Sequence, residues 1–332
     1  MQPFSYADYF GQISLLGDLL LDGRERPWLS TIPAEPERKQ YVVWLGCNVL
    51  RTVHIVETLN DILRHLGFDY VMLGGPASCC GVQHARRGET ETGRKLAWTT
   101  FDKFDAFAPE RLLFWCPSCD HRLNGMGDDM SDLAARRQHV TEFFLEHLDR
   151  FDFKPLAQPM RVALHAHTGT PQQDLDTRAT RRLLEAIPGV EVVDVPAVTE
   201  LGFHCADPKI AQLPHGQFGQ ILAESVAGAE AQGVETLVTI YHACHRELVP
   251  VDSADDEVGG LKIENYVTLL ARALGLPEHQ DRFKRFAQLE SPEAIMAELQ
   301  PRIEQLGVSR ERVERAVVAQ FGSPSALAAA IR

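Results

Sequence analysis

Five of the seven cysteines in this sequence follow a spacing that suits metal–sulfur chemistry. A single cysteine is followed by an adjacent pair and then by a C-x-x-C motif; these are Cys47, Cys79, Cys80, Cys116 and Cys119. Thiolates gathered from separate places along a chain are ligands for zinc and for iron–sulfur clusters. The fifth cysteine favours iron–sulfur, because a tetrahedral zinc ion would leave one thiolate without a metal bond.

Other interpretations of these five residues remain open. They could be buried structural cysteines without metal, a zinc site made of four thiolates, or a catalytic dithiol in which the C-x-x-C spacing lowers a thiol pKa. His84 and His121 follow Cys80 and Cys119 closely in the sequence. Either histidine could tune a cluster from outside its ligand shell, and either could be an ordinary surface residue.

A second group of candidate ligands combines two cysteines with five histidines. They are His165, His167, His204, Cys205, His242, Cys244 and His245. Two thiolates and two imidazoles from this group would suit one zinc or iron ion. Alternatively, the group would bind substrate, with a histidine giving a proton to a departing thiolate. The candidate catalytic residues are Cys79, Cys80 and His204.

Both groups follow the ends of predicted strands. Apolar runs predict buried parallel strands, and apolar residues at helical spacing predict the helices between them. The first half has strands at 41–45, 70–73 and 111–115 and helices at 55–66 and 93–107; the second has strands at 161–164, 190–195 and 236–240 and helices at 177–187 and 219–232. Ligands bind at the carboxyl ends of strands in open α/β sheets, so each group is expected to meet there.

The predicted fold is therefore an α/β protein of two pseudo-symmetric, Rossmann-like halves with parallel sheets. We expect a leader at 1–39, a first half at 40–158, a second half at 159–261 and a helical C-terminal extension at 262–332. Neither a G-x-G-x-x-G motif nor a Walker loop is present, so nothing in the sequence supports a bound nucleotide or flavin.

The bulk composition narrows the class of protein. The chain has 332 residues and 45% hydrophobic residues, enough for two cores, and a net charge of −13, which argues against a nucleic-acid partner. No apolar run reaches transmembrane length, and the first residues do not resemble a secretory signal. We expect a cytoplasmic protein, in which thiols stay reduced and available for metal ligation.

The residues of the first group resemble the cysteine-rich, or CCG, family, whose best-known member is the B-type polypeptide of heterodisulfide reductase. The family carries two copies of a five-cysteine motif with a CCG triplet and a C-x-x-C. Residues 47 to 119 match all five cysteines, including Gly81 after the pair. The second copy departs from the motif, since Thr168, His204, Ala206 and Tyr241 replace expected cysteines or glycine.

The resemblance implies a noncubane [4Fe-4S] cluster at the first site, used with two electrons to cleave or form a sulfur–sulfur bond. It also implies ferredoxin-like and flavoprotein subunits as partners and a small sulfur compound as substrate. The degenerate second site would hold zinc, iron or no metal. Two other functions remain open: a non-catalytic zinc- or iron–sulfur-binding scaffold, and an electron-transfer subunit of a hydroxy-acid dehydrogenase.

Overall fold

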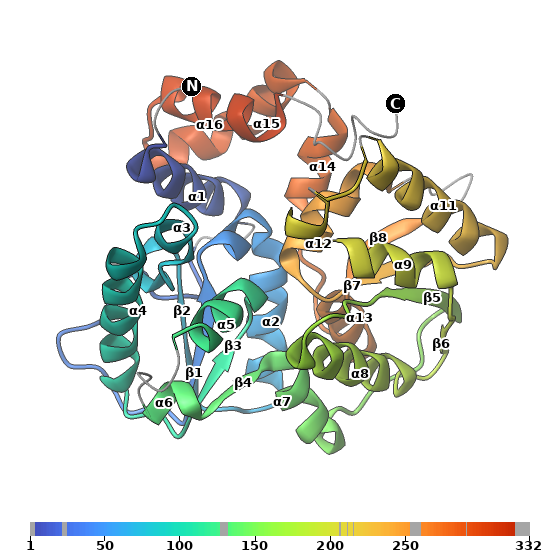
Figure 1. The fold of residues 1–332 in the computed structure, drawn as a ribbon, viewed down its shortest axis with the longest axis horizontal. Helices are drawn as coiled ribbons and strands as arrows, with labels where there is room; N and C mark the ends of the chain where they lie inside the picture. Colours follow the sequence, from blue (N-terminus) through green and yellow to red (C-terminus); the bar gives the residue numbers. More distant parts are fainter. Residues whose placement is uncertain are drawn as a thin grey trace. The chain divides into compact units, whose positions relative to one another are not determined.

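The computed structural model describes residues 4–21, 25–126, 132–205, 207–210, 212–214, 216–252, 260–289 and 291–322. The chain divides into two compact units, Met1–Phe143 and Phe144–Arg332. Each unit contains one four-stranded sheet in which all strand pairs are parallel (Figure 1). The predicted α/β fold with two similar halves is therefore confirmed.

The first sheet has the strand order β2-β1-β3-β4. Its strands are β1 (Tyr41–Gly46), β2 (Tyr70–Gly74), β3 (Arg111–Phe114) and β4 (Arg137–His139). The helices are α1 (Tyr6–Leu20), α2 (Val53–His65), α3 (Val82–Ala85), α4 (Thr90–Asp105), α5 (Pro117–Asn124) and α6 (Asp132–Ala135), and α7 (Val140–Glu146) crosses the boundary between the units. The chain turns one way from β1 to β2 and the other way to β3, so the switch point lies between β1 and β3.

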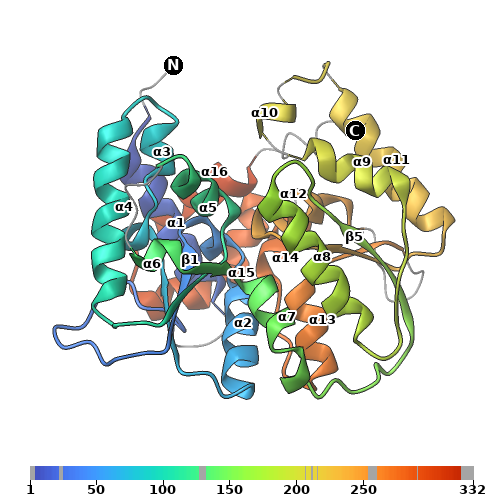
Figure 2. The same cartoon turned by 60° about the horizontal axis from the view of Figure 1, so that its bottom comes forward.

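Aromatic packing joins α4 to one face of this sheet. The ring of Trp44 on β1 meets the rings of Phe101 and Phe104 on α4 edge to face, at centroid distances of 5.8 and 5.5 Å. All three are fully buried, and such pairs add about 1 kcal/mol each to the free energy gained by burying the rings. Figures 1 and 2 show α4 on one side of the sheet and α2 on the other.

The second sheet repeats the first, with the order β6-β5-β7-β8. Its strands are β5 (Met160–His165), β6 (Val190–Val192), β7 (Thr236–Thr239) and β8 (Lys262–Asn265). The helices are α8 (Pro171–Glu185), α9 (Pro196–His204), α10 (Asp207–Ile210), α11 (Gln217–Ala231), α12 (His242–Leu248), α13 (Tyr266–Ala273), α14 (Arg282–Leu289), α15 (Pro292–Leu306) and α16 (Arg310–Phe321). Helices α9 and α11 pack together, as do α8 and α13 (Figure 2).

Several elements lie where the sequence predicted none, and three of them bear on the sheets and on the leader. Helix α1 occupies the leader, β4 extends the first sheet, and β8 completes the second sheet. Strand β8 begins at Lys262, the residue at which we expected the helical extension to start, so the second half continues past that point. Within the part of the chain that the structure describes, no helix is both long and apolar enough to cross a membrane.

Candidate functional site

The five cysteines of the first group meet at the carboxyl edge of the first sheet. Cys47 follows β1, the pair Cys79 and Cys80 follows β2 after one 3-10 turn, and Cys116 and Cys119 lie after β3 at the start of α5. All five are buried. Their thiols form a continuous series of side-chain hydrogen bonds in the order Cys47, Cys79, Cys80, Cys119 and Cys116. The sequence therefore predicted a group of residues that the fold brings into contact.

Gly46, the last residue of β1, leaves room for two of these thiols. Its φ of +75° lies in the left-handed region, which glycine adopts without steric cost. A Cβ atom at this position would lie 3.1 Å from the Cβ of Cys116 and 3.3 Å from the Sγ of Cys119. Any side chain here would therefore crowd the space in which the sulfur atoms lie.

Three buried contacts fix the loop that carries the cysteine pair. The indole N–H of Trp44 donates to the carbonyl of Ser78 at 2.8 Å, and the hydroxyl of Thr100 donates to the carbonyl of Cys79 at 3.0 Å. The backbone N–H of Gly81 donates to the Sγ of Cys79 at 3.3 Å. The loop is thus tied to β1 and α4, so the pair is held in place before any metal binds.

Gly81 is also the point at which this loop touches α4. Its φ is +74°, and a Cβ atom here would overlap the carbonyl of Gly93 in α4. The glycine of the Cys-Cys-Gly triplet therefore allows a backbone-to-backbone approach that no other residue permits. This contact sets the distance between the cysteine pair and the helix that covers it.

The thiols differ strongly in acidity because they share hydrogen bonds. Hydrogen bonds from Cys47 and Cys80, together with the N–H of Gly81, outweigh burial and lower the pKa of Cys79 to about 3. Hydrogen bonding from Cys119 likewise lowers the pKa of Cys116. The hydrogen bonds that Cys47 and Cys119 donate, burial and the neighbouring negative charge raise the pKa values of these two thiols. For Cys80 the hydrogen bond from Cys119 lowers the pKa, but the bond to Cys79, burial and the neighbouring charge outweigh it, so the pKa is raised. A buried cation would stabilise further thiolates here.

Helix α1 links two of the cysteine loops. The hydroxyl of Tyr9 accepts hydrogen bonds from the side-chain amides of Asn48 and Gln83, each at 3.2 Å. Asn48 directly follows the first cysteine, and Gln83 lies three residues after the pair. The leader therefore contributes directly to the geometry of this site, which the sequence did not reveal.

The two histidines predicted beside the first site have different surroundings. His84 stacks on Tyr6 with a centroid distance of 3.8 Å, and its Nδ1 lies 2.6 Å from a carboxylate oxygen of Glu89. His84 also contributes to lowering the pKa of Cys79, so it lies close enough to influence that thiol. His121 is exposed on α5. Of the two, His84 is the better candidate for tuning the site.

His139 is a neighbour of this site that sequence reasoning missed. It ends β4 and is buried. The N–H of Thr141 donates to its Nδ1 at 3.3 Å, so Nε2 carries the proton and donates to the carbonyl of Trp115 at 3.1 Å. His139 thus fixes the residue before Cys116 and lies close to that thiol.

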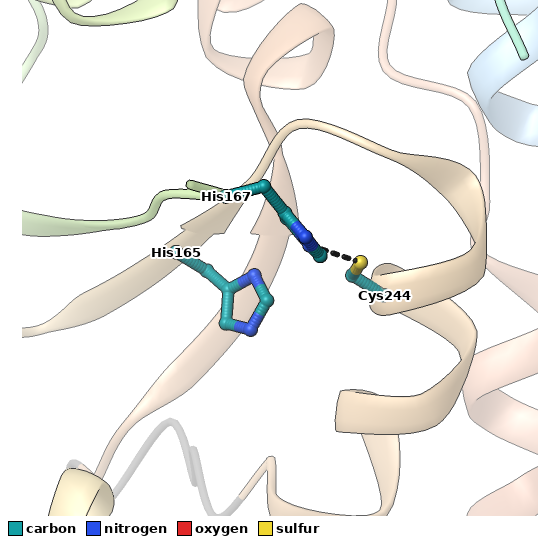
Figure 3. Close-up of side chains that lie close together, drawn as sticks. All are labelled: His165, His167 and Cys244. Atoms are coloured by element: carbon teal, nitrogen blue, oxygen red, sulfur yellow. Dashed lines mark hydrogen bonds between the residues drawn. The ribbon is translucent and has the colours of Figure 1, made fainter. Parts of the chain in front are cut away.

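The second group forms a smaller cluster at the equivalent edge of the second sheet. His165 and His167 come from the end of β5, and Cys244 comes from α12 after β7; one ligand atom from each lies within 4.8 Å of the others. The Nε2 of His167 lies 2.8 Å from the Sγ of Cys244 (Figure 3). Cys205, at the end of α9, hydrogen-bonds with Cys244 and contacts His165.

The pKa values of the two thiols next to each other in this unit, Cys205 and Cys244, are shifted in opposite directions. The hydrogen bond from Cys244 outweighs burial and, with His165 nearby, lowers the pKa of Cys205 to about 5. The same bond and burial raise the pKa of Cys244. Burial, with help from the charges of His165 and Lys209, lowers the pKa of His167 well below its usual value, so its imidazole is neutral and able to ligate a metal.

The other predicted members of this group have different positions. The Nε2 of His245 lies 2.6 Å from a carboxylate oxygen of Asp281, and its Nδ1 lies 3.5 Å from the hydroxyl of Thr239. His242 is buried at the start of α12. His204 is half-buried at the end of α9, where it packs edge-on against Phe203. None of the three belongs to the cluster that the described residues His165, His167 and Cys244 form.

These observations define a class of protein. It is a duplicated α/β protein in which each sheet presents sulfur-bearing side chains at its switch point. The chain belongs to the CCG family, described as a cysteine-rich domain, because the family model matches two segments, residues 41–124 and 166–249. The family predicted from the cysteine motif is thereby confirmed.

Similar proteins come from three species of Methanosarcina. The chain is 25% identical over 274 residues to the D-type polypeptide of the dihydromethanophenazine:CoB–CoM heterodisulfide reductase of Methanosarcina acetivorans, a match that covers 77% of this chain and 64% of that polypeptide. The corresponding polypeptides of Methanosarcina barkeri and Methanosarcina mazei are 24% and 28% identical over 72% of this chain and 60% of their own length. This chain therefore spans less than two thirds of these relatives.

Proposed function

We propose that this chain is the iron–sulfur subunit of a heterodisulfide-reductase-like oxidoreductase. In this proposal the first unit holds a noncubane [4Fe-4S] cluster through Cys47, Cys79, Cys80, Cys116 and Cys119. The observation that supports it most is the continuous contact among five buried thiols at the switch point of a parallel sheet. Five thiolates exceed the four that a tetrahedral zinc ion would use.

The residues present fit such a cluster. Gly46 keeps a side chain out of the space beside Cys116 and Cys119, and the lowered pKa values of Cys79 and Cys116 favour the thiolates that iron binds. When bound, the cluster would supply the two electrons that cleave a sulfur–sulfur bond, or accept the two electrons that are released when one forms. The amide of Gly81 donates to one sulfur, and hydrogen bonds of this kind raise the reduction potential of a bound cluster.

The names of the relatives support a proposal for the substrate class. These relatives are heterodisulfide reductases by name, and we propose a disulfide or thiol of small sulfur compounds as the substrate here. Cys79 and Cys80 would lie next to the reacting sulfur. We also propose that His204, which is half-buried, gives a proton to a departing thiolate.

Electrons must come from outside this sequence. The two cysteine groups use all seven cysteines, so no set remains for a ferredoxin-type cluster. We propose ferredoxin-like and flavoprotein subunits as the partners. We also propose a cytoplasmic location, because reducing conditions keep thiols available for iron.

Anaerobic purification with measurement of iron, acid-labile sulfide and zinc tests the proposal. We expect about four iron and about four sulfide per chain, and an EPR signal after oxidation in the presence of a thiol. Cys80→Ser should lose most of the iron and sulfide. Cys244→Ser, which removes a buried cysteine of the second unit, is the matched control and should keep both.

Three results would contradict the proposal. Colourless protein without sulfide but with zinc in the first site would favour the scaffold alternative. Iron retained in Cys80→Ser would remove this cysteine from the ligand set and leave the first site with no more thiolates than a zinc site uses. The protein could also carry a full cluster and yet reduce none of a range of small disulfides in the presence of an electron donor. That result would support the cluster but contradict the proposed sulfur chemistry.

A further inference from the structure

The second unit brings four metal-binding side chains together from three segments. His165 ends β5, His167 lies two residues later and Cys244 lies in α12 after β7; one ligand atom from each of these three lies within 4.8 Å of the others. Cys205, which follows α9, joins them through its hydrogen bond with Cys244. The sulfur of Cys244 links the group, since it lies 2.8 Å from the Nε2 of His167 and hydrogen-bonds with Cys205. Figure 3 shows the imidazoles of His165 and His167 beside Cys244.

His165 supplies the observation that points to a ligand. Its side chain is fully buried, and neither ring nitrogen has a hydrogen-bond partner of ordinary geometry among the described residues. A buried polar group without a partner costs about 1–3 kcal/mol of folding free energy, so native proteins satisfy almost all of them. A metal ion bound to one ring nitrogen would give that nitrogen a partner.

The backbone is shaped to bring Cys205 into the group. A Cβ atom at Gly202 in α9 would overlap the carbonyl of Ala166, the residue between the two histidines. Helix α9 can therefore lie directly against the end of β5, about one turn before Cys205. No side chain other than hydrogen fits at Gly202 without displacing this helix and its cysteine.

Neighbouring groups hold the histidine loop in one conformation. The hydroxyl of Thr177 donates to the carbonyl of His167 at 3.0 Å. The Nζ of Lys209 donates to the carbonyl of Phe203 at 2.7 Å and reaches that of Thr168 at 3.4 Å, which ties this loop to the end of α9. These bonds fix the positions of ligands on both segments, as metal sites require.

The chemical types of the four ligand side chains favour zinc over other metals. Two thiolates and two imidazoles match the tetrahedral preference of zinc, and the two negative charges balance one divalent cation in a buried place. A noncubane cluster of the kind proposed for the first unit would need five thiolates, and only two cysteines lie in this unit. Four protein ligands leave no open position for substrate on a tetrahedral ion, which is typical of structural zinc.

We propose that His165, His167, Cys205 and Cys244 bind one zinc ion that holds β5, α9 and α12 of the second unit together. This proposal does not depend on the cluster or on the sulfur chemistry of the first unit. It narrows the seven candidate residues of the sequence to four and leaves His204, His242 and His245 outside the ligand set.

The test measures zinc in the full-length protein. We expect about one zinc per chain, with at least tenfold less in His165→Ala and Cys244→Ser. His204→Ala changes a half-buried histidine next to the site and should keep its zinc. Zinc should also remain in Cys80→Ser, even where iron is lost, so failure of the first-site proposal and failure of this one give different results.

Cobalt provides a second measurement that does not depend on the folding of variants. Wild-type protein grown or reconstituted with Co²⁺ should show the visible d–d bands of tetrahedral cobalt and the near-ultraviolet bands of thiolate-to-cobalt charge transfer. Wild-type protein without zinc, with about eight iron per chain, or with an octahedral cobalt spectrum would overturn the proposal. Full zinc in His165→Ala would overturn it as well.

Discussion

Gly46→Ala offers a direct test of how the first site is shaped. The substitution has two costs that the structure separates. One is backbone strain, because a residue with a Cβ at a φ of +75° loses about 1–2 kcal/mol. The other is crowding, because the new methyl group would lie 3.1 Å from the Cβ of Cys116 and 3.3 Å from the Sγ of Cys119.

Gly67→Ala is the matched control. Gly67 follows α2 with a φ of +71°, and no described atom lies within 4 Å of the position that its new methyl group would take. This variant should therefore bear the backbone cost alone. Overpacking typically costs about 1–3 kcal/mol, so we expect Gly46→Ala to be less stable than the control by about that amount.

Urea unfolding of the metal-free variants and iron measurement after anaerobic reconstitution are the assays. The control should bind iron and sulfide as the wild type does. Gly46→Ala should bind much less, because the two displaced sulfur atoms no longer face the same space. If both variants had equal stability and equal iron content, the inference that Gly46 keeps the sulfur space open would be wrong.

Two further substitutions test other parts of the structure. Arg272 hydrogen-bonds to the buried carboxylate of Glu264; although burial raises the pKa of Glu264, this bond and the nearby positive charges hold it at about 2. A lowered pKa stabilises the folded state at pH values above the usual carboxyl pKa, so Glu264→Gln should lower the free energy of unfolding by about 3 kcal/mol at pH 7. The difference between this variant and the wild type in urea unfolding should shrink as the pH falls toward the folded-state pKa of Glu264. Tyr9→Phe removes two hydrogen bonds to Asn48 and Gln83 and should cost about 1–2 kcal/mol; unchanged stability and an unchanged rate of iron loss to a chelator would contradict the role of α1.

The sequence predicted the strands that carry the first site because two signals, an apolar run and a cysteine after it, mark the same positions. β1 and β3 are continuous apolar runs, and a cysteine follows each one. The rule that ligands gather at the carboxyl edge of a parallel sheet then placed the five cysteines together without any distance information. Periodicity and spacing were sufficient at this site because each thiol lies within a few residues of a buried strand.

Strands β4 and β8 were not predicted from the sequence, and the reason is physical. β4 reads Arg137-Gln138-His139 and β8 contains Lys262 and Glu264, so neither shows an apolar pattern. Both lie at the outer edge of their sheets, and specific pairing supports their polar residues, as the bond from Arg137 to Asp120 at 2.7 Å shows. Tertiary contacts of this kind override local propensity, and His139 was missed together with its strand.

The histidines of the second unit could not be sorted by spacing alone. His165 and His245 both lie at or just after strand ends in the sequence, yet His245 bonds to Asp281 in a segment 36 residues further along the chain. Which imidazole faces a sulfur depends on such distant partners. It also depends on Gly202, whose missing side chain lets α9 approach β5. Only the folded structure contains this information.

The two units use one scaffold in chemically different ways. Strand β1 ends in Gly46, which contributes no side chain and leaves the space beside it to thiols from other loops. Strand β5 ends in His165, whose buried imidazole fills the corresponding edge of the second sheet with a nitrogen donor. An empty strand end suits a cluster of several metal ions, whereas a strand end that supplies its own ligand suits a single ion. A change of residue at one strand terminus, together with the loss of cysteines around it, would therefore be sufficient to account for the multi-iron site proposed in one unit and the mononuclear site proposed in the other.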